Sequence, residues 1–319
     1  MLFEPHKRVI PDKGITVLSL FNGISCGRVA LERAGVSVER YVSYEIEEAA
    51  NAVAKYNYPS DEYLGDVFEG DFTQYQGFDL LIGGSPCTYW SIARGGADRE
   101  VTCDGMGFKL FMQFVRALNE SHCKYFLYEN NSSISKDIQN EISKRLQVEP
   151  VEINSMEFSA QMRKRLYWTN IPFSKEYPHS DKVIKDIEYS CKHDIKSFEK
   201  YKETIKFNKD NTIVSWDTSG KGNYSQQNRA RYNTIKMNTL PSSGNDKNNI
   251  YLGGYSFRKI HPIEAERLQT LPDGFTECVK SASKRVELCG NGWTVDVIAW
   301  ILKNLKSMQF ISNNYLTTT

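Results

Sequence analysis

Cys87 is the residue of this 319-residue chain best suited to covalent chemistry. It ends the segment "GGSPC" (83–87), which directly follows the apolar run Leu80–Ile82. Buried cysteines are common and mostly inert, so the rest of the chain must decide whether Cys87 is a nucleophile. Glu129 follows a second apolar run, Tyr125–Tyr128. If the two runs are adjacent strands, a thiol and a carboxyl group would meet in one cleft.

Two arginines could supply positive charge to such a cleft. The segment "QMRKR" (161–165) precedes the apolar run Leu166–Trp168. In an extended chain, alternating residues point to one face, so Gln161, Arg163 and Arg165 would lie together. Two guanidinium groups on one face suit a phosphate or an anionic intermediate. A surface salt bridge is the simpler interpretation of either arginine alone.

Three segments at predicted strand ends could form a pocket for an adenosine-containing cofactor. The turn "FNGISCG" (21–27) contains glycines that let a ligand approach backbone N–H groups. Glu45 lies roughly twenty residues further on, where a carboxylate typically accepts the hydroxyl groups of a ribose. Asp66, in the turn "GDV", could accept from an adenine amino group. Each residue alone is equally consistent with an ordinary turn or helix start.

The elements that must position these residues follow from hydrophobic periodicity. The predicted strands are Ile15–Leu20, Tyr41–Tyr44, Asp79–Ile82, Tyr125–Tyr128 and Leu166–Trp168. The predicted helices are Arg28–Ala34, Glu47–Tyr56, Phe108–Leu118, Ser135–Leu146, His261–Leu271 and Val295–Leu305. Strands that alternate with helices predict a doubly wound α/β sheet. Ligands of such sheets bind beyond the carboxyl ends of the strands, where the candidate residues lie.

The middle of the chain differs in character. Residues 174–254 are rich in Lys, Asn, Ser, Tyr and Gly and carry few periodic apolar runs. We predict a small irregular domain there, between a domain of residues 1–173 and a segment, 255–319, that returns to it. The small domain has a local excess of basic residues, including Lys221, Arg229 and Arg231. For charge alone, a solvated surface is the simpler interpretation.

Composition narrows the class of protein. A hydrophobic content of 40% and a charged content of 25% are ordinary for a globular domain, and the net charge of +1 requires any basic surface to be local. Seven cysteines without a CxxC pair argue against a disulfide framework or a zinc ribbon. No apolar run reaches about eighteen residues. These features predict a cytoplasmic protein without a metal or a membrane partner, monomeric or weakly self-associating.

The motifs, taken together and in their order along the chain, indicate a protein family far more specifically than any single motif does. The chain resembles the cytosine-C5 DNA methyltransferase family in "LSLFNGISCG", "YEIE", "GD" (65–66), "GGSPC", "YEN", "QMRKR", "RKIHPIEAERLQTLPDGF" and "GNGWTVDVI". These stretches cover nearly all of residues 15–303 apart from the variable middle. The segments "SPCTYWSIARGG" and "NTIKMNTLPSSGNDKN" are most similar to the mammalian de novo branch. The chain departs from many relatives at Thr88, where a glutamine is common, and at Asn131, where a valine is common.

The resemblance implies a fold, a cofactor, a substrate and a set of residues. The fold would be a Rossmann-like class I methyltransferase sheet, with 174–254 as the target-recognition domain. The chemistry would be that of a DNA (cytosine-5-)-methyltransferase from a prokaryote or a phage, acting on a flipped-out cytosine in double-stranded DNA. Whether it belongs to a restriction-modification system with a partner nuclease or acts alone is left open by the sequence. The loop 88–107 would form a mobile cover. The implied catalytic residues are Cys87, Glu129, Arg163 and Arg165. The implied binding residues for S-adenosyl-L-methionine are Phe21, Asn22, Gly23, Ile24, Ser25, Gly27, Glu45, Ile46, Asp66, Val67, Pro86, Asn291 and Trp293. The implied DNA contacts are Gln161, Lys221, Arg229 and Arg231.

Three other interpretations remain open. An RNA cytosine-C5 methyltransferase is one, because a relative within this fold acts on tRNA. A catalytically dead DNA-binding module is less favoured, since Cys87, Glu129 and Arg165 are all present. An unrelated cofactor-binding α/β enzyme would have to match eight ordered motifs by chance.

Overall fold

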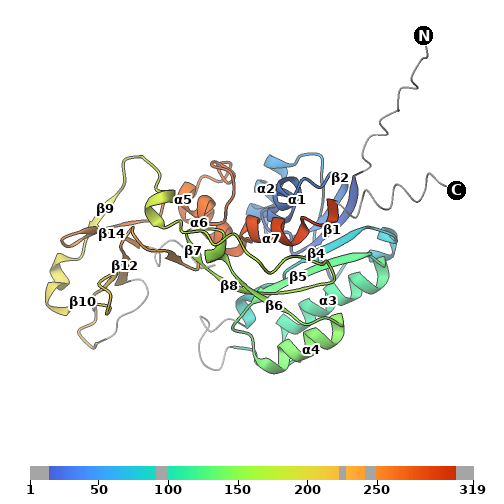
Figure 1. Ribbon diagram of the computed structural model, residues 1–319, viewed down its shortest axis with the longest axis horizontal. Helices are drawn as coiled ribbons and strands as arrows, with labels where there is room; N and C mark the ends of the chain where they lie inside the picture. The colour runs from blue at the N-terminus through green and yellow to red at the C-terminus, as the bar shows by residue number, and fades with distance from the viewer. Residues whose placement is uncertain (1–13, 91–98, 223–227, 241–248, 307–319) are drawn as a thin grey trace, which may run out of the picture.

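A seven-stranded, mostly parallel sheet forms the larger part of the protein in the computed structural model, which describes residues 14–90, 99–222, 228–240 and 249–306 (Figure 1). The strand order is β3-β2-β1-β4-β5-β8-β6. Strand β8 runs antiparallel to both of its neighbours, β5 and β6, and the other strand pairs of this sheet are parallel. The strands are β1 (Ile15–Leu20), β2 (Val38–Tyr44), β3 (Glu62–Leu64), β4 (Leu80–Gly83), β5 (Tyr125–Asn131), β6 (Val151–Asn154) and β8 (Lys164–Thr169). The predicted doubly wound α/β sheet is confirmed.

Helices cover both faces of this sheet (Figure 1). On one face lie α1 (Cys26–Arg33), α2 (Glu48–Asn57) and α7 (Val295–Leu302), and on the other lie α3 (Met106–Ser121) and α4 (Lys136–Leu146). The central strands are therefore buried on both sides, which explains why they are continuous apolar runs. Val17 belongs to one apolar cluster and Leu18 to the other.

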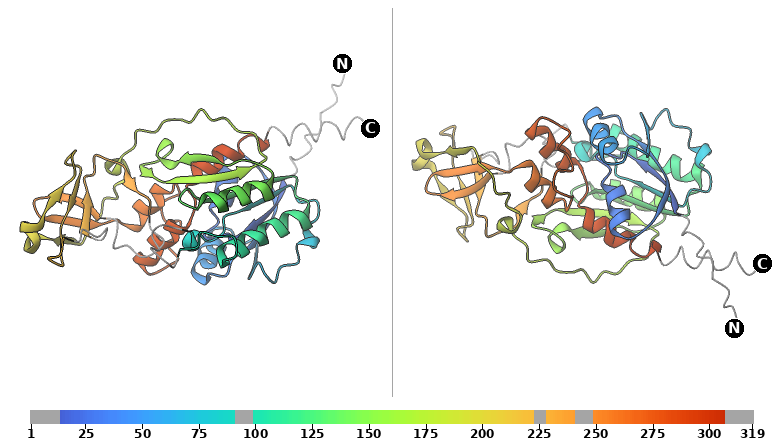
Figure 2. Two further views of the ribbon diagram at one scale, coloured as in Figure 1. Left: turned by 90° about the horizontal axis from the view of Figure 1, so that it is seen from below. Right: turned by 90° about the horizontal axis from the view of Figure 1, so that it is seen from above.

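The C-terminal segment packs against the large domain. Helices α5 (Pro262–Leu268) and α6 (Ala282–Asn291) lie between the two sheets, and their buried apolar residues join the same core as helix α1 (Figures 1 and 2). Helix α5 begins where His261 accepts a hydrogen bond from the N–H of Ile263, with Pro262 in the first turn. A proline is favourable there because that position has no intrahelical N–H partner to lose.

The middle of the chain, for which the sequence predicts an irregular domain, forms a second, smaller sheet. Its strand order is β10-β11-β12-β14-β15-β9. The strands are β9 (Ile195–Ser197), β10 (Lys206–Phe207), β11 (Ile213–Ser215), β12 (Arg229–Arg231), β14 (Asn249–Gly253) and β15 (Ser256–Lys259). Its own core contains Phe198 and Trp216, whose rings stack with centroids 4.4 Å apart. These strands have two to five residues, too few for a periodic pattern to be visible in the sequence.

The limits of the small sheet differ from the predicted 174–254. Its strands lie between residues 195 and 259, and the preceding chain instead runs along the large domain, where Ile184 and Ile187 are buried in the main core. The two parts are joined by a buried ion pair, in which both guanidinium Nη atoms of Arg258 lie 2.8 Å from Glu264 oxygens. A bidentate pair of this kind fixes orientation as well as distance.

The described residues also bear on membrane spans, metal-binding groups and cysteine pairing. None of the helices described is long and apolar enough to cross a membrane. Within the same residues, no group of three or more His, Cys, Asp or Glu side chains is arranged to hold a metal ion. All seven cysteines are unpaired. Of the predicted loop 88–107, residues 91–98 lie outside the described part of the chain.

Candidate active site

A pocket of about 320 Å³ opens where the carboxyl ends of β1, β2, β4 and β5 meet. Strand order reverses between β1 and β4, the place where doubly wound sheets bind their ligands. The lining residues are Ser19, Phe21, Asn22, Gly23, Cys26, Gly27, Glu45, Ile46, Glu47, Gly84, Ser85, Pro86, Cys87, Thr88, Glu129, Arg163, Arg165, Asn291, Gly292 and Trp293.

The loop after β1 has an unusual backbone. Phe21, Gly23 and Ser25 all have positive φ, at 56°, 55° and 63°. Left-handed conformations cost energy for Phe and Ser, so the surroundings must hold them. Asn22 does this: its Oδ1 accepts from the hydroxyls of Ser19 and Tyr41, and its Nδ2 donates to Ser25 Oγ. The loop is therefore fixed from behind and presents its backbone to the pocket.

Gly27 lets helix α1 approach the sheet closely. A Cβ at this position would lie 2.5 Å from Ile82 Cδ1, which is closer than carbon atoms can approach. The glycine thus brings the start of α1 against the end of β4.

Glu45 is held in place by three backbone N–H groups. Its Oε2 accepts from Gly23, and its Oε1 accepts from Ile46 and Glu47, each at 2.8 Å. The carboxylate links the loop after β1 to the start of α2. A carboxylate oxygen can accept two hydrogen bonds, so Oε2 keeps capacity for a ligand hydroxyl.

Cys87 lies half-buried at the start of a short 3₁₀ turn, Cys87–Tyr89, immediately after β4 and Pro86. Its carbonyl oxygen accepts a hydrogen bond of 3.4 Å from Asn131 Nδ2, at the end of β5. The other cysteine of the pocket, Cys26, is fully buried, and burial raises its pKa to about 12. Cys26 therefore remains a thiol at neutral pH, which makes Cys87 the better candidate nucleophile of the two.

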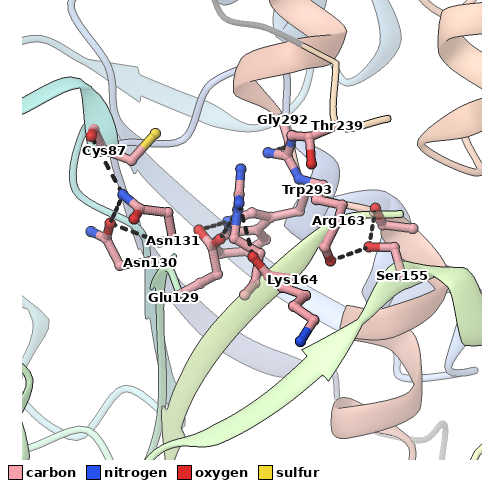
Figure 3. A network of polar contacts seen from close by, with 12 residues as sticks. Cys87, Glu129, Asn130, Asn131, Ser155, Arg163, Lys164, Thr239, Gly292 and Trp293 are labelled. Atoms are coloured by element: carbon pink, nitrogen blue, oxygen red, sulfur yellow. Dashed lines mark hydrogen bonds and ion pairs between the residues drawn. The ribbon is translucent and has the colours of Figure 1, made fainter. Parts of the chain in front are cut away.

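Glu129 faces Cys87 across the pocket, from strand β5 next to β4 (Figure 3). Its Oε2 accepts a hydrogen bond of 2.9 Å from Trp293 Nε1. Its Oε1 lies 2.9 Å from Arg165 Nε, but this ion pair is not aligned as a hydrogen bond, and Oε1 has no hydrogen-bond partner. A buried carboxylate oxygen in this state is a ready acceptor for a ligand donor.

Arg163 supplies a second buried charge. Its Nη2 donates to the carbonyl oxygens of Gly290 and Gly292, at 3.1 and 3.0 Å, while its buried Nη1 has no hydrogen-bond partner. Burial, assisted by the nearby charge of Arg165, lowers the pKa of Arg163 to about 10. The guanidinium remains charged at neutral pH, so it can stabilise an anion in the pocket.

The structure gathers most of the predicted residues into this pocket. All four predicted catalytic residues line it, as do nine of the predicted cofactor residues: Phe21, Asn22, Gly23, Gly27, Glu45, Ile46, Pro86, Asn291 and Trp293. Ile24, Ser25 and Val67 are instead buried and do not line it. Asp66 is not among the lining residues, and its Oδ1 accepts from the N–H of Phe68.

The predicted DNA contacts divide into two groups. Gln161 is fully buried, and neither atom of its side-chain amide has a hydrogen-bond partner, so it has no surface to offer DNA in this conformation. Lys221 and Arg229 are exposed, and Arg231 is half-buried. None of these three lines the pocket.

Sequence reasoning missed several lining residues, namely Ser19, Cys26, Glu47, Gly84, Ser85 and Gly292. Cys26 lies within the motif "FNGISCG", and Gly84 and Ser85 lie within "GGSPC". Four of the six, Cys26, Glu47, Ser85 and Gly292, directly adjoin a predicted residue, and that position was the available signal. Gly84 and Gly292 contribute backbone and space, and the Ser19 hydroxyl supports Asn22 from behind the loop, roles that residue type alone does not reveal.

Known proteins share this sequence pattern and fold. The profile of the C-5 cytosine-specific DNA methylase family matches residues 15–169 and 142–307. The orphan methyltransferase M.SPRI of Bacillus phage SPR is 31% identical over 209 residues, covering 58% of this chain and 46% of the relative. The type II methyltransferase M.FnuDI of Fusobacterium nucleatum is 28% identical over 331 aligned residues, covering 91% of this chain and 94% of the relative. This chain thus spans less than half of the phage protein and nearly all of the bacterial one.

Solved structures agree on the architecture. The Entamoeba histolytica methyltransferase EhMeth superposes with a TM-score of 0.68 at 15% identity, covering 92% of this chain and 99% of that one. A Spodoptera frugiperda DNMT2 mutant superposes with a TM-score of 0.62 at 16% identity, covering 93% of this chain and 100% of that one. At these identities the likeness concerns the fold, while the family profile covers almost the whole described chain. The chain belongs to the C-5 cytosine-specific DNA methylase family.

Proposed function

We propose that this protein transfers a methyl group from S-adenosyl-L-methionine to C5 of a flipped-out cytosine in duplex DNA, through a covalent adduct with Cys87. One observation carries the proposal: Cys87 and Glu129, from adjacent strand ends, share a pocket with the Glu45 carboxylate and two arginines. A nucleophile, a carboxyl group and a cation are the groups that addition to a cytosine ring requires.

The residues on the other side of the pocket fit the cofactor. Glu45 has acceptor capacity for ribose hydroxyls, exposed Ile46 offers an apolar surface beside it, and Asn291 also lines the pocket. The bound cofactor would supply an electrophilic methyl group, with its sulfur keeping the electron pair of the broken bond.

The protein groups would then act on the base. Addition of the Cys87 thiolate to C6 forms a carbon–sulfur bond and pushes the electron pair of the C5–C6 double bond toward C5. Glu129 would hold the N3 edge and the exocyclic amine, and Arg165 the O2 side, as charge spreads into the ring. After C5 gains its methyl group, loss of the C5 proton to a base restores the double bond and expels the thiolate. A cytosine stacked inside a duplex cannot reach Cys87, so the cytosine must first be flipped out.

The small sheet supports a DNA substrate. Ala230 packs into the core of this sheet, so its neighbours Arg229 and Arg231 extend from the opposite face. Arg231 is in register with Ile250, and Ile250 with Arg258, which anchors this same face to helix α5. The two arginines therefore lie on the side of the small sheet that faces the large domain. Burial and the charge of Arg229 lower the pKa of Arg231 to about 10, so Arg231 remains cationic at neutral pH. Guanidinium groups on this face suit a phosphate backbone.

The test is a substitution at the nucleophile combined with a trapping substrate. Cys87→Ser should abolish transfer of tritiated methyl groups to duplex DNA, because a hydroxyl is a far poorer nucleophile toward C6. Cys191→Ser, which changes an exposed cysteine outside the pocket, is the matched control and should remain active. With 5-fluorocytosine in the methylated site, the wild-type protein should form an adduct that survives denaturant, because fluorine at C5 cannot leave as a proton does.

The outcomes separate the alternatives. Transfer to tRNA but not to duplex DNA would replace the DNA substrate with an RNA one. A Cys87→Ser protein with a near-normal rate, or a wild-type protein that methylates its ordinary site but forms no fluorinated adduct, would rule out the covalent route. No transfer to either nucleic acid would support a module that only binds.

A further inference from the structure

We infer that Trp293 is a positioning residue for Glu129: its indole N–H holds one oxygen of the carboxylate so that the other faces the base. This inference rests on the proposed function. Its central observation is the hydrogen bond of 2.9 Å from Trp293 Nε1 to Glu129 Oε2, between residues 164 positions apart in the chain. Figure 3 shows the indole and the carboxylate in contact beside Arg163.

The turn that carries Trp293 is fixed by buried hydrogen bonds. Arg163 Nη2 donates to the carbonyl oxygens of Gly290 and Gly292. Gln269 Nε2 donates to Cys289 O at 2.6 Å, and its Oε1 accepts from Thr294 Oγ1 at 2.7 Å. The residues on both sides of Trp293 are therefore tied to Gln269, which directly follows helix α5, and to Arg163, which gives the indole little freedom to move.

Two glycines provide the space in which the indole and the carboxylate meet. A Cβ at Gly84 would lie 2.9 Å from Glu129 Oε2 and 3.2 Å from Trp293 Nε1. A Cβ at Gly27 would lie 3.4 Å from Trp293 Cζ3. The ring is thus packed against the starts of the two segments that follow β1 and β4.

The two oxygens of Glu129 have different surroundings as a result. Oε2 has a strong donor, whereas Oε1 has only the unaligned charge of Arg165 and no hydrogen bond. A carboxylate rotates readily about its last torsion, so without the indole N–H either oxygen could turn away from the base. The indole selects one orientation before the base arrives, which lowers the cost of organising the transition state.

The competing role for Trp293 is a simple wall of the cofactor pocket, since its ring lines that pocket. The two roles make different demands. A wall requires the aromatic ring, whereas positioning requires the N–H. Trp293→Phe keeps a ring and removes the donor, and Trp293→Ala removes both.

The experiment compares turnover, cofactor affinity and a spectroscopic signal. Trp293→Phe should lower kcat by about tenfold, as expected for loss of a hydrogen bond to a charged group, while affinity for S-adenosylhomocysteine changes by less than about threefold. Trp293→Ala should also weaken binding of that analogue. The matched control is Trp300→Phe, which removes an indole N–H that donates to Ser174 O, away from the pocket. Its kcat should equal that of the wild type.

A direct readout does not depend on activity. In protein labelled with ¹⁵N at its five tryptophans, the Trp293 indole resonance, identified by its absence in Trp293→Phe, should move upfield in Glu129→Ala. An unmoved resonance would overturn the inference. So would a Trp293→Phe protein with unchanged kcat, or one in which only cofactor affinity falls. A wild-type protein without any methyl transfer would instead overturn the proposed function, and the positioning role with it, even if the resonance moves.

Discussion

Gly84 leaves the space that Glu129 occupies, because a Cβ there would lie 2.9 Å from the carboxylate Oε2 and 3.1 Å from the Glu129 carbonyl oxygen. We predict that Gly84→Ala lowers kcat by about a hundredfold, since a displacement of about 1 Å at a reacting group has effects of this size. The free energy of unfolding should fall by only about 1 kcal/mol, as for mild overpacking. Single-turnover rates and urea denaturation measure the two effects. A variant that turns over normally would show that the carboxylate tolerates the displacement.

At the residue scale, what could be predicted depended on whether the contribution comes from a side chain. Cys87, Glu129 and Glu45 carry groups whose chemistry is recognisable, and their order along the chain identified them. Gly84 contributes the space that a side chain would fill, and Trp293 contributes a hydrogen bond to a residue far away in the sequence. Neither contribution is visible until the strand ends are placed side by side.

At the element scale, α1 and the chain that enters β3 meet through a poorly solvated carboxylate. Asp61 has a side chain only 7% exposed, and its Oδ2 lies 3.4 Å from Arg28 Nε. Burial outweighs this cation and, with a contribution from Glu32, raises the pKa of Asp61 from 3.8 to about 6. The folded protein therefore binds this proton more tightly than the unfolded chain does. Stability is lost as the pH rises from about 4 to 6 and stays low above that.

We predict that Asp61→Asn stabilises the protein at pH 8 by about 1 to 3 kcal/mol, the upper value being that of the full pKa shift. The gain should shrink toward zero near pH 4, where Asp61 is protonated in the folded state. Urea denaturation at both pH values measures it. Asp71→Asn is the comparison: the Thr73 hydroxyl and N–H lower the pKa of Asp71, so this change should bring no gain at pH 8. A gain for Asp61→Asn that is independent of pH would exclude the electrostatic cause.

The elements themselves were unequally predictable. Strand β1 has the predicted limits, and β4 and β5 begin within one residue of theirs, because strands buried on both faces are unbroken apolar runs. Strand β3 is a short edge strand of three residues, and the small sheet has strands of two to five residues with polar outer faces. Such strands are stabilised by neighbours distant in sequence, which leaves little local signal.

For the whole molecule, the separation of pocket and small sheet predicts separate effects on chemistry and on DNA affinity. Replacing Lys221, Arg229 and Arg231 together by glutamine should reduce the slope of log affinity against log salt by up to about three, if each contacts one phosphate. Sequence preference should change less than affinity, because phosphate contacts position a protein without reading bases. Fluorescence anisotropy with labelled duplex DNA over a range of salt concentrations measures the slope.

The control removes the same charge from the outer face of the large domain. Helix α4 lies there, away from the small sheet (Figure 1). Its basic residues for this purpose are Lys136, Lys144 and Arg145. Their replacement should leave the slope unchanged. Equal losses in both triple variants would mean that general charge, rather than the face of the small sheet, governs DNA affinity.

The two apolar clusters on either side of the large sheet have a consequence for synthesis of the chain. The cluster under α3 and α4 draws only on residues 18–168, whereas the one under α1 and α7 needs residues from Ile15 to Leu305. At translation rates of about 5 to 20 residues per second, the ribosome takes roughly seven to thirty seconds to add the missing part. During that time a nascent chain could complete one side of its sheet while the other stays uncovered. The uncovered side, lined by residues such as Val17 and Val29, is then the surface on which chaperones would act.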